Sequence, residues 1–300
     1  ICNQLLSYYE SFSFENLRES LKYLSDLYLG TSLGWLEPET CPEFGPLPGY
    51  DDCLARLKSD NSKNKIIAIL FYRSHFLAND FEPIQMIIDA IKKSGSVALP
   101  IYCSMMKRSN GDIHPIERIL RSDQNACVAN VVIDCLSYTT ADVSTTGNIA
   151  RVNEDVEGLF SKLNCPVLHA LYCSESEADW LKNPKGMNPR DMAMKVVMPE
   201  FDGKIIAHPI GFVEQSQKNG RIVPLYKGNS ERIDRLVSLA NNYAELGFKE
   251  NKDKKIATIL TNYPTQNARI GNAVGLDTPA SLIRRSEERR VGKECRSRWS

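Results

Sequence analysis

The fold of this chain is decided by the stretch Ile66-Ile-Ala-Ile-Leu-Phe71, the segment Asp80-Phe-Glu-Pro-Ile-Gln-Met-Ile-Ile-Asp-Ala-Ile-Lys-Lys-Ser-Gly95 and the run Val97-Ala-Leu-Pro-Ile-Tyr102. The first and last pieces are continuously apolar, which is typical of parallel strands covered on both faces. The middle piece has a proline in its first turn and ends at a glycine, as helices commonly do. Its isoleucines recur at helical spacing: Ile84, Ile87, Ile88 and Ile91. The stretch therefore predicts a strand–helix–strand unit.

The same alternation continues along the chain. Further apolar strands are expected at residues 128–133, 166–172 and 204–209. Helices are expected at residues 114–121, 154–163, 188–197 and 231–246. Residues 215–229 are polar and are expected to form a loop. This order predicts an α/β fold with doubly wound, mostly parallel sheets flanked by helices.

The pattern divides the chain into four parts. Residues 1–60 are expected to form a helical segment and a Pro-rich connector, with Ser13 capping a helix that ends at Gly30. Four leucines of this helix share one face: Leu17, Leu21, Leu24 and Leu27. Residues 61–250 form the α/β domain, and residues 251–284 open a second, truncated α/β domain with a strand at 256–260. Residues 285–300 resemble the in-frame translation of a sequencing adapter and are left out of the fold prediction.

Composition excludes several classes of protein. The 300 residues carry 37 Lys or Arg and 37 Asp or Glu; without the last sixteen the counts are 31 and 34, a net charge of −3, so no basic field attracts nucleic acid. The alternative is that the tail is a natural basic segment that binds nucleic acid. No apolar run approaches the length of a membrane span, and no signal peptide is evident. The nine cysteines form no Cys-x-x-Cys pair, so the sequence does not support a zinc ribbon or a thioredoxin motif. With no signal peptide, a reducing cytoplasm is expected. Because the chain begins with Ile1 rather than Met, we expect a fragment.

The first candidate site follows the predicted strand that ends at Phe71. Open α/β sheets bind ligands at the carboxyl ends of their strands. Arg73 could hold a carboxylate there, and His75 could bind a metal or move a proton. The alternative is that Arg73 pairs with a nearby acid and His75 caps the turn.

The second candidate combines Glu200, Asp202 and His208. Two carboxylates and an imidazole suit a divalent first-row metal ion, if they meet across a turn. The alternative is a hairpin turn at Asp202-Gly203 that is flanked by solvated acids.

The third candidate is the polar loop that follows residues 256–260. Its polar groups include Asn262, Arg269, Asn272 and Asp277. Gly271 and Gly275 permit positive φ or a close approach to a ligand. Asp277-Thr-Pro begins a helix, whose amino end can bind an anion. The alternative is a crossover loop in which Asp277 only caps that helix. The chain carries no P-loop sequence.

Four motifs, taken in order, resemble one known family. They are Asn16 to Gly34, Ile69-Leu-Phe-Tyr-Arg-Ser-His75 with Asp80, Asn188 to Gly203, and Asn262-Tyr-Pro followed by Arg269-Ile-Gly-Asn-Ala-Val-Gly-Leu-Asp-Thr-Pro-Ala-Ser281. Together they look like the large, CobN-type subunit of aerobic cobaltochelatase, which is homologous to the porphyrin-binding H subunit of magnesium chelatase. Asn267, Ala268 and Ala273 depart mildly from the family pattern.

The resemblance implies a corrin-binding subunit. Such a subunit works with two smaller subunits, one of them an AAA+ ATPase that hydrolyses ATP, to insert cobalt(II), the substrate metal, into hydrogenobyrinic acid a,c-diamide. The substrate-binding residues would be Arg73, Asn262, Arg269, Gly271, Asn272 and Asp277. His75 and Glu200 would be catalytic, and the metal would meet His75, Asp202 and His208. Two alternatives remain: a magnesium or nickel relative, and a non-enzymatic Rossmann-like binding module. Because the family's downstream motifs are absent, we expect no activity from this chain alone.

Overall fold

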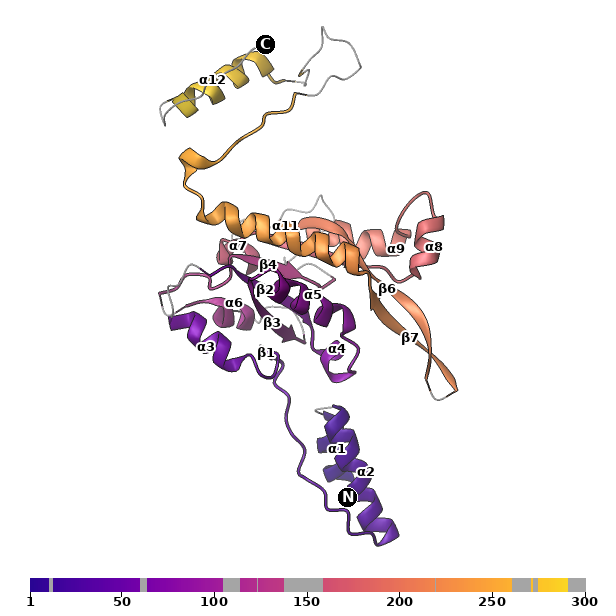
Figure 1. Cartoon of the computed structure of the whole chain (residues 1–300). Coiled ribbons are helices and arrows are strands. Elements are labelled where there is room, and N and C mark those ends of the chain that lie inside the picture. The colour runs from indigo at the N-terminus through magenta and orange to yellow at the C-terminus, as the bar shows by residue number, and fades with distance from the viewer. Residues whose placement is uncertain are drawn as a thin grey trace, which may run out of the picture. The chain divides into compact units, whose positions relative to one another are not determined.

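The computed structural model describes residues 1–10, 13–59, 64–104, 114–122, 124–137, 159–218, 220–260, 271 and 275–290 (Figure 1). The chain divides into two compact units, Ile1–Glu245 and Leu246–Ser300. No helix within the described ranges is long and apolar enough to cross a membrane.

One sheet forms the centre of the first unit. Among the described residues it has seven strands in the order β1-β3-β2-β4-β5-β6-β7. Their bounds are β1 Phe44–Pro46, β2 Ile66–Tyr72, β3 Val97–Cys103, β4 Val131–Asp134, β5 Val167–Tyr172, β6 Ile205–Lys218 and β7 Arg221–Gly228. Strands β3, β2, β4, β5 and β6 run parallel, while β1 and β7 pair antiparallel at the two edges. The winding of the parallel strands reverses at β2, between β3 and β4, and this is where open α/β sheets bind ligands.

Helices cover both faces of the sheet. The helices of the α/β part include α3 Asp51–Ser59, α4 Arg73–Leu77, α5 Glu82–Lys93, α6 Pro115–Leu120, α7 Leu159–Leu163, α8 Glu177–Lys182, α9 Pro189–Met192, α10 Met198–Glu200 and α11 Ser230–Phe248. Strand β2 is buried on both faces of the sheet. Ile67, Ile69 and Phe71 pack with α5 and α11 on one face, and the residues that alternate with them pack with α3, α6 and α7 on the other. The α/β fold and the parallel sheet predicted from the apolar runs are confirmed.

The predicted polar loop at 215–229 is wrong. Strand β6 continues to Lys218 and pairs with β7 in an antiparallel ribbon, from Gly211↔Gly228 to Lys218↔Arg221. A ribbon that water can reach needs no apolar face, because its backbone hydrogen bonds join the two strands, so its polar sequence resembles a loop. The missed signal was Asn219-Gly220, a dipeptide typical of hairpin turns.

Two other predicted elements differ in the structure. The helix expected at 188–197 begins with α9 but continues as a π-helical turn, η1 (Ala193–Val197), before α10. The strand expected at 256–260 does not form: in the described part of the second unit these residues are extended and unpaired, with Ile259 86% exposed. An apolar run becomes a strand only when a neighbouring strand satisfies its backbone groups. The helix expected at 154–163 is described only from Leu159 onward.

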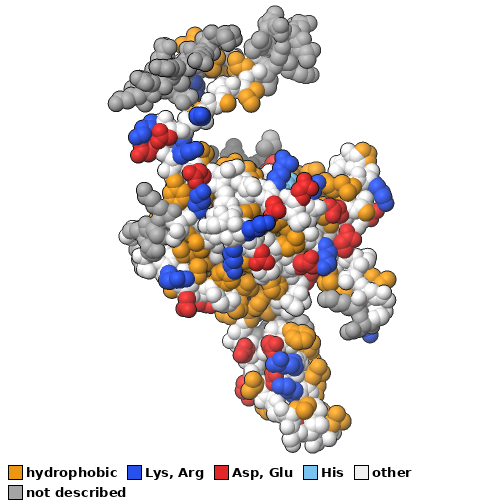
Figure 2. All heavy atoms as spheres, viewed as in Figure 1, with side chains coloured by type: hydrophobic (Ala, Val, Ile, Leu, Met, Phe, Trp, Pro, Cys, Tyr) orange, Lys and Arg blue, Asp and Glu red, His pale blue; other side chains and the backbone are white. Residues whose placement is uncertain are grey.

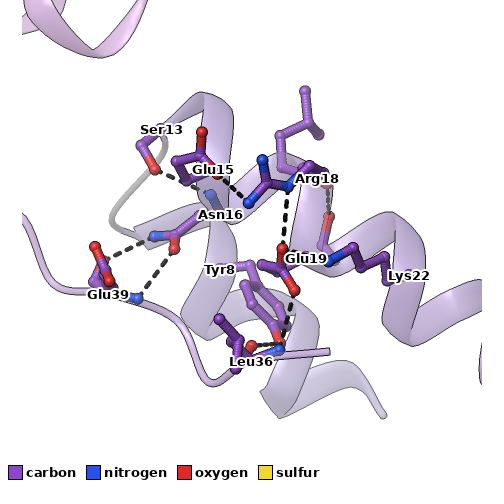
Figure 3. Close-up of polar contacts among 11 residues, drawn as sticks. Tyr8, Ser13, Glu15, Asn16, Arg18, Glu19, Lys22, Leu36 and Glu39 are labelled. Atoms are coloured by element: carbon purple, nitrogen blue, oxygen red, sulfur yellow. Dashed lines mark hydrogen bonds and ion pairs between the residues drawn. The ribbon is translucent and has the colours of Figure 1, made fainter. Parts of the chain in front are cut away.

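The amino-terminal segment is held together by polar contacts rather than by its leucines. It contains α1 (Cys2–Glu10) and α2 (Phe14–Leu29), and α2 begins at the Ser13 cap and ends at Gly30 as predicted. Figure 3 shows Asn16 and Glu19 of α2 pointing toward the connector. Asn16 exchanges two hydrogen bonds with the backbone of Glu39, at 2.8 and 3.0 Å, and Glu19 accepts from the Leu36 amide at 3.0 Å. The hydrogen bonds from Lys22 and from Leu36 lower the pKa of Glu19 to about 2.

Apolar side chains are left exposed on this segment. They include Leu6, Phe14, Leu21, Leu27, Tyr28 and Leu29. On the viewed face, hydrophobic side chains gather along one side of these helices, whereas charges of both signs are interspersed over the α/β part (Figure 2). The leucine spacing therefore predicted the helix correctly, but the buried face is the polar one.

The second unit contains a short 3-10 turn and one described helix. These are η2 (Asn251–Asp253) and α12 (Thr278–Arg290). Asp277 caps α12, because its carboxylate accepts the Ala280 amide at 3.0 Å, which confirms the predicted helix start.

Candidate functional site

A small pocket, with room for about one water molecule, lies where β2, β4 and β5 end. It is lined by Phe71, His75, Asp80, Phe81, Pro83, Ile84, Cys135, Tyr172 and Tyr226. Phe71 and Tyr172 belong to β2 and β5, Cys135 follows β4, and Tyr226 comes from β7. The pocket thus occupies the edge of the sheet at which α/β proteins bind ligands, next to the point where the winding reverses.

His75 reaches this pocket because α4 begins immediately after β2. Its imidazole meets the Tyr226 ring edge to face, with centroids 5.3 Å apart. Burial lowers the pKa of His75, although the nearby Asp80 carboxylate acts in the opposite direction. A neutral imidazole at the wall of a pocket can accept a proton or bind a metal ion. The sequence placed His75 at the end of the first strand, and the structure confirms that position.

Arg73 lies on the same short helix but does not line the pocket. Its Nη2 donates to the Cys41 carbonyl oxygen at 2.6 Å, so it fastens the connector to the end of β2. Its buried Nε has no hydrogen-bond partner within the described residues. The alternative expectation, in which Arg73 pairs with an acid, also differs from this contact with a carbonyl oxygen.

The acids and the histidine of the second candidate serve different contacts. Glu200 is exposed at the end of α10. Asp202 is buried, and its Oδ2 lies 3.1 Å from Lys204 Nζ. His208 Nε2 lies 2.8 Å from the Arg232 carbonyl oxygen. Three or more His, Cys, Asp or Glu side chains placed to share a metal ion occur nowhere in the described ranges. The metal set of His75, Asp202 and His208 is therefore not assembled, since Asp202 faces Lys204, just ahead of β6, and His208 faces Arg232 on α11.

The alternative of a hairpin turn with solvated acids is also wrong. Residues 201–203 form a turn between α10 and β6, with Gly203 at φ 68°, and no strand precedes it. The side chain of Asp202 is only 1% exposed, because Lys204 holds it inside the protein.

A buried charged cluster beside the sheet was not anticipated. Lys204 Nζ lies 2.9 Å from Asp134 Oδ2, and the same oxygen lies 3.1 Å from His169 Nδ1. Burial of Asp134 raises its pKa, but the charge of Lys204 and the contact with His169 outweigh it and leave the pKa below the ordinary value. Burial lowers the pKa of Lys204, but the charges of Asp134 and Asp202 outweigh it and leave that pKa raised. Asp134 and Lys204 thus stay ionised in an apolar setting.

The sequence signal for this cluster was weak. Asp134 and His169 end or interrupt apolar strand runs, and they face each other in the β4–β5 register. A polar residue inside such a run indicates a buried partner, but it does not say which one. Lys204 completes the set only because β6 lies beside β5.

The motif from Asn188 to Gly203 is anchored by a second buried acid, Asp191. Its Oδ2 accepts the amide and the hydroxyl of Ser174, at 2.7 and 2.9 Å, and its Oδ1 pairs with Lys195 at 2.8 Å. Because Ser174 follows β5, these bonds fix α9 at the same sheet edge as the pocket. Asn188, at which the helix predicted from the sequence begins, caps this helix, because its side-chain oxygen accepts the Asp191 amide at 2.9 Å.

The third candidate is only partly described. Asn262, Arg269 and Asn272 lie outside the described residues. Gly271 has φ 70°, its carbonyl accepts the Thr278 hydroxyl, and a Cβ at this position would lie 2.5 Å from Thr278 Cγ2. The predicted need for glycine here is confirmed, and its cause is a close contact within the loop.

Comparisons with known proteins agree on the family. The chain is 34% identical over 285 residues to the aerobic cobaltochelatase subunit CobN of Pseudomonas aeruginosa, covering 92% of this chain and 21% of that protein. It is 24% identical over 228 residues to the magnesium-chelatase subunit ChlH of Oryza sativa subsp. indica, covering 76% of this chain and 15% of the relative.

A solved structure shares the fold. The catalytic subunit of cobaltochelatase from Mycobacterium tuberculosis superposes with a TM-score of 0.77 at 29% identity, over 96% of this chain and 22% of that one. The chain therefore spans about a fifth of the length of the cobaltochelatase subunits that it matches. The family model named CobN/Magnesium Chelatase matches residues 6–288, nearly the whole chain. The chain belongs to the CobN/magnesium chelatase family.

Proposed function

We propose that this chain is part of the corrin-binding large subunit of an ATP-dependent cobaltochelatase, which inserts cobalt(II) into hydrogenobyrinic acid a,c-diamide. The observation that carries this proposal is the 34% identity to a cobaltochelatase subunit over 92% of the chain. The matched magnesium-chelatase subunit is more distant, at 24% identity. The sequences Arg269-Ile-Gly-Asn272 and Gly275-Leu-Asp-Thr-Pro279 also resemble the cobaltochelatase branch of the family more than the magnesium-chelatase branch.

Metal insertion requires a group that removes protons from the ring nitrogens. Cobalt must also exchange its water ligands for those nitrogens. In the proposal His75 serves this step, because its neutral imidazole can accept a proton or meet the incoming metal. Glu200 is exposed and can act as a carboxylate base when substrate covers it. Asp202 and His208 are engaged elsewhere, which leaves His75 as the favoured metal contact.

The pocket is much smaller than such a substrate. It has room for about one water molecule, so a macrocycle cannot enter it. We therefore propose that one edge of the macrocycle lies over its opening. In the second unit, Asn262, Arg269, Gly271, Asn272 and Asp277 are proposed to contact the carboxylate and amide groups of the corrin. Arg73 is not included, because its guanidinium binds the Cys41 carbonyl oxygen and does not line the pocket.

The partners are proposed from the family. Two smaller subunits would act with this one in the cytoplasm, and one of them, an AAA+ ATPase, would hydrolyse ATP. The absence of a P-loop from the 300-residue sequence is consistent with that division of labour.

The test is reconstitution of the full-length subunit with its partner subunits. Cobalt insertion into the corrin and magnesium insertion into a porphyrin are followed separately by absorbance. Cobalt insertion alone supports the proposal. Magnesium insertion alone would instead establish the alternative, a magnesium-chelatase-type H subunit that binds a porphyrin.

A pair of variants tests the role of His75. We expect His75→Gln to lower kcat by about 100-fold, which is within the usual contribution of a general base. Ser74→Ala is the matched control, because Ser74 is an exposed neighbour on the same helix. Equal kcat values for the two variants would remove His75 from the mechanism.

A further inference from the structure

Two cysteine sulfurs lie close together at the amino ends of the parallel strands, the opposite end from the pocket. Cys127 Sγ lies 3.8 Å from Cys165 Sγ, and both thiols are free and half-buried. Cys127 precedes β4 and Cys165 precedes β5, and these strands are parallel neighbours. The amino ends of parallel neighbours lie side by side, so the sheet itself brings together two thiols that are 38 residues apart in the chain.

The segments that carry the two thiols are held in place by Arg121. Its Nη1 donates to the Asn125 carbonyl oxygen at 2.8 Å, and its Nη2 donates to the Lys162 carbonyl oxygen at 3.2 Å. Arg121 also forms an antiparallel bridge with Cys127. One side chain therefore links the loop before β4 to the end of α7, just ahead of Cys165, and keeps the sulfurs in contact.

The two thiols differ in acidity. Hydrogen bonding from Cys165 lowers the pKa of Cys127, against the effect of burial, and the Ala129 backbone and the charge of Arg121 act in the same direction. The same contact and burial raise the pKa of Cys165. Cys127 is thus the thiol that ionises first, and Cys165 holds the second proton.

The buried cysteines of the sheet contrast with this pair. Burial raises the pKa of Cys103 and of Cys173 to about 12, so at neutral pH these thiols stay protonated and unreactive. Thiol–disulfide exchange requires a thiolate with a second thiol in reach. Cys127 and Cys165 meet both conditions.

We propose that Cys127 and Cys165 are a redox modification site that forms a reversible disulfide with a low-molecular-weight disulfide of the glutathione type. The Cys127 thiolate attacks one sulfur of the oxidant and releases one thiol, leaving a mixed disulfide. Cys165 then loses its proton, attacks the Cys127 sulfur and releases the second thiol. The cysteine pair is oxidised by two electrons, and the oxidant is reduced to two thiols.

The cross-link would join the loops that lead into β4 and β5. It would restrict the unfolded chain and so raise the resistance of the sheet to unfolding, as a disulfide that closes a long loop does. The side chains at the carboxyl ends of the strands, including those of the His75 pocket, would keep their positions, because the cross-link lies at the amino ends of the strands. The expected effect is therefore on stability.

The test is exposure of the full-length subunit to oxidised glutathione, followed by peptide mapping under non-reducing conditions. We expect a Cys127–Cys165 cross-linked peptide, its loss on reduction, and a higher Tm for the oxidised protein. Cys165→Ser should stop at a glutathione adduct on Cys127, whereas Cys127→Ser should leave Cys165 unmodified.

Cys53→Ser is the matched control, since Cys53 is a half-buried thiol on α3 and makes no sulfur–sulfur contact within the described residues. That variant should form the cross-link as the wild type does. Independent glutathione adducts on Cys127 and Cys165 without a cross-link would overturn the proposal. So would two thiols that stay reduced while Cys53 reacts.

Discussion

The buried ion pairs of Lys204 should contribute strongly to the free energy of unfolding. Lys204→Met keeps a long apolar side chain but removes the charge that faces both Asp134 and Asp202. Both carboxylates would then lack their cation in a setting where the Lys204 and Asp134 side chains are 0% exposed. Breaking a buried pair by removing one partner costs about 3–5 kcal/mol. We therefore expect the free energy of unfolding to fall by about that amount at pH 7.

The pH dependence of this effect follows from the direction of each pKa. The pKa of Asp134 is lowered by folding, so its contribution is present above the ordinary carboxyl pKa and is lost as the pH falls through the lowered value. The pKa of Lys204 is raised, so its contribution is present below the ordinary lysine pKa and is lost as the pH rises through the raised value. Neutral pH lies inside both windows. In Lys204→Met, protonation of Asp134 removes the carboxylate charge that has lost its lysine, so the loss of stability should shrink as the pH is lowered.

The assay is urea unfolding of the wild type and the variant, followed by circular dichroism. Lys65→Met is the matched control, because Lys65 pairs with Glu245 at the surface and such pairs contribute about 0–1 kcal/mol. Asp134→Asn combined with Lys204→Met should lose less than the two single changes added together. A loss for Lys204→Met no larger than that of Lys65→Met would refute the account of the cluster.

Three further predictions concern the fold and the pocket. Ile87→Ala should lower the free energy of unfolding by about 2–5 kcal/mol, because Ile87 is fully buried between α5 and the sheet, and Leu29→Ala, at a position 78% exposed, should change it little in the same urea titration. Ser13→Ala should cost about 1 kcal/mol, because the hydroxyl accepts the Asn16 amide at 3.0 Å; faster hydrogen exchange in the first turn of α2 would show it, and Ser13→Asp should restore protection. Because folding lowers the pKa of His75, the wild type should lose stability as the pH falls below about 6.5; a wild-type and a His75→Phe Tm that vary equally with pH would contradict this.

The position of the pocket could be predicted from local patterns, whereas its contents could not. The apolar run at 66–71 identifies a buried strand, and a polar segment directly after it must lie at the carboxyl end of that strand. The position of His75 could therefore be predicted. Tyr172 and Tyr226 come from β5 and β7, and no spacing in the sequence shows that these strands bring their rings beside His75. The expected metal site of His75, Asp202 and His208 is not assembled for the same reason. Asp202 and His208 are close in sequence, but that closeness does not show which residues of other elements their side chains contact.

The sequence by itself determined which segments are strands and helices where burial imposes a period: the alternation that begins at residue 66, except for the exposed ribbon at 215–228, the cap at Ser13, and the helix that begins after Asp277. The sequence also indicated the family, because the four motifs occur in the family's order. Only the tertiary structure decided the contacts that depend on the order and register of strands: the pairing of Lys204 with Asp134, the meeting of Cys127 with Cys165, and the contact of Arg73 with Cys41. Hydrophobic periodicity is a local property of the chain. The partner of a buried charge or thiol is set by which strands become neighbours, and that is settled only when the whole sheet has formed.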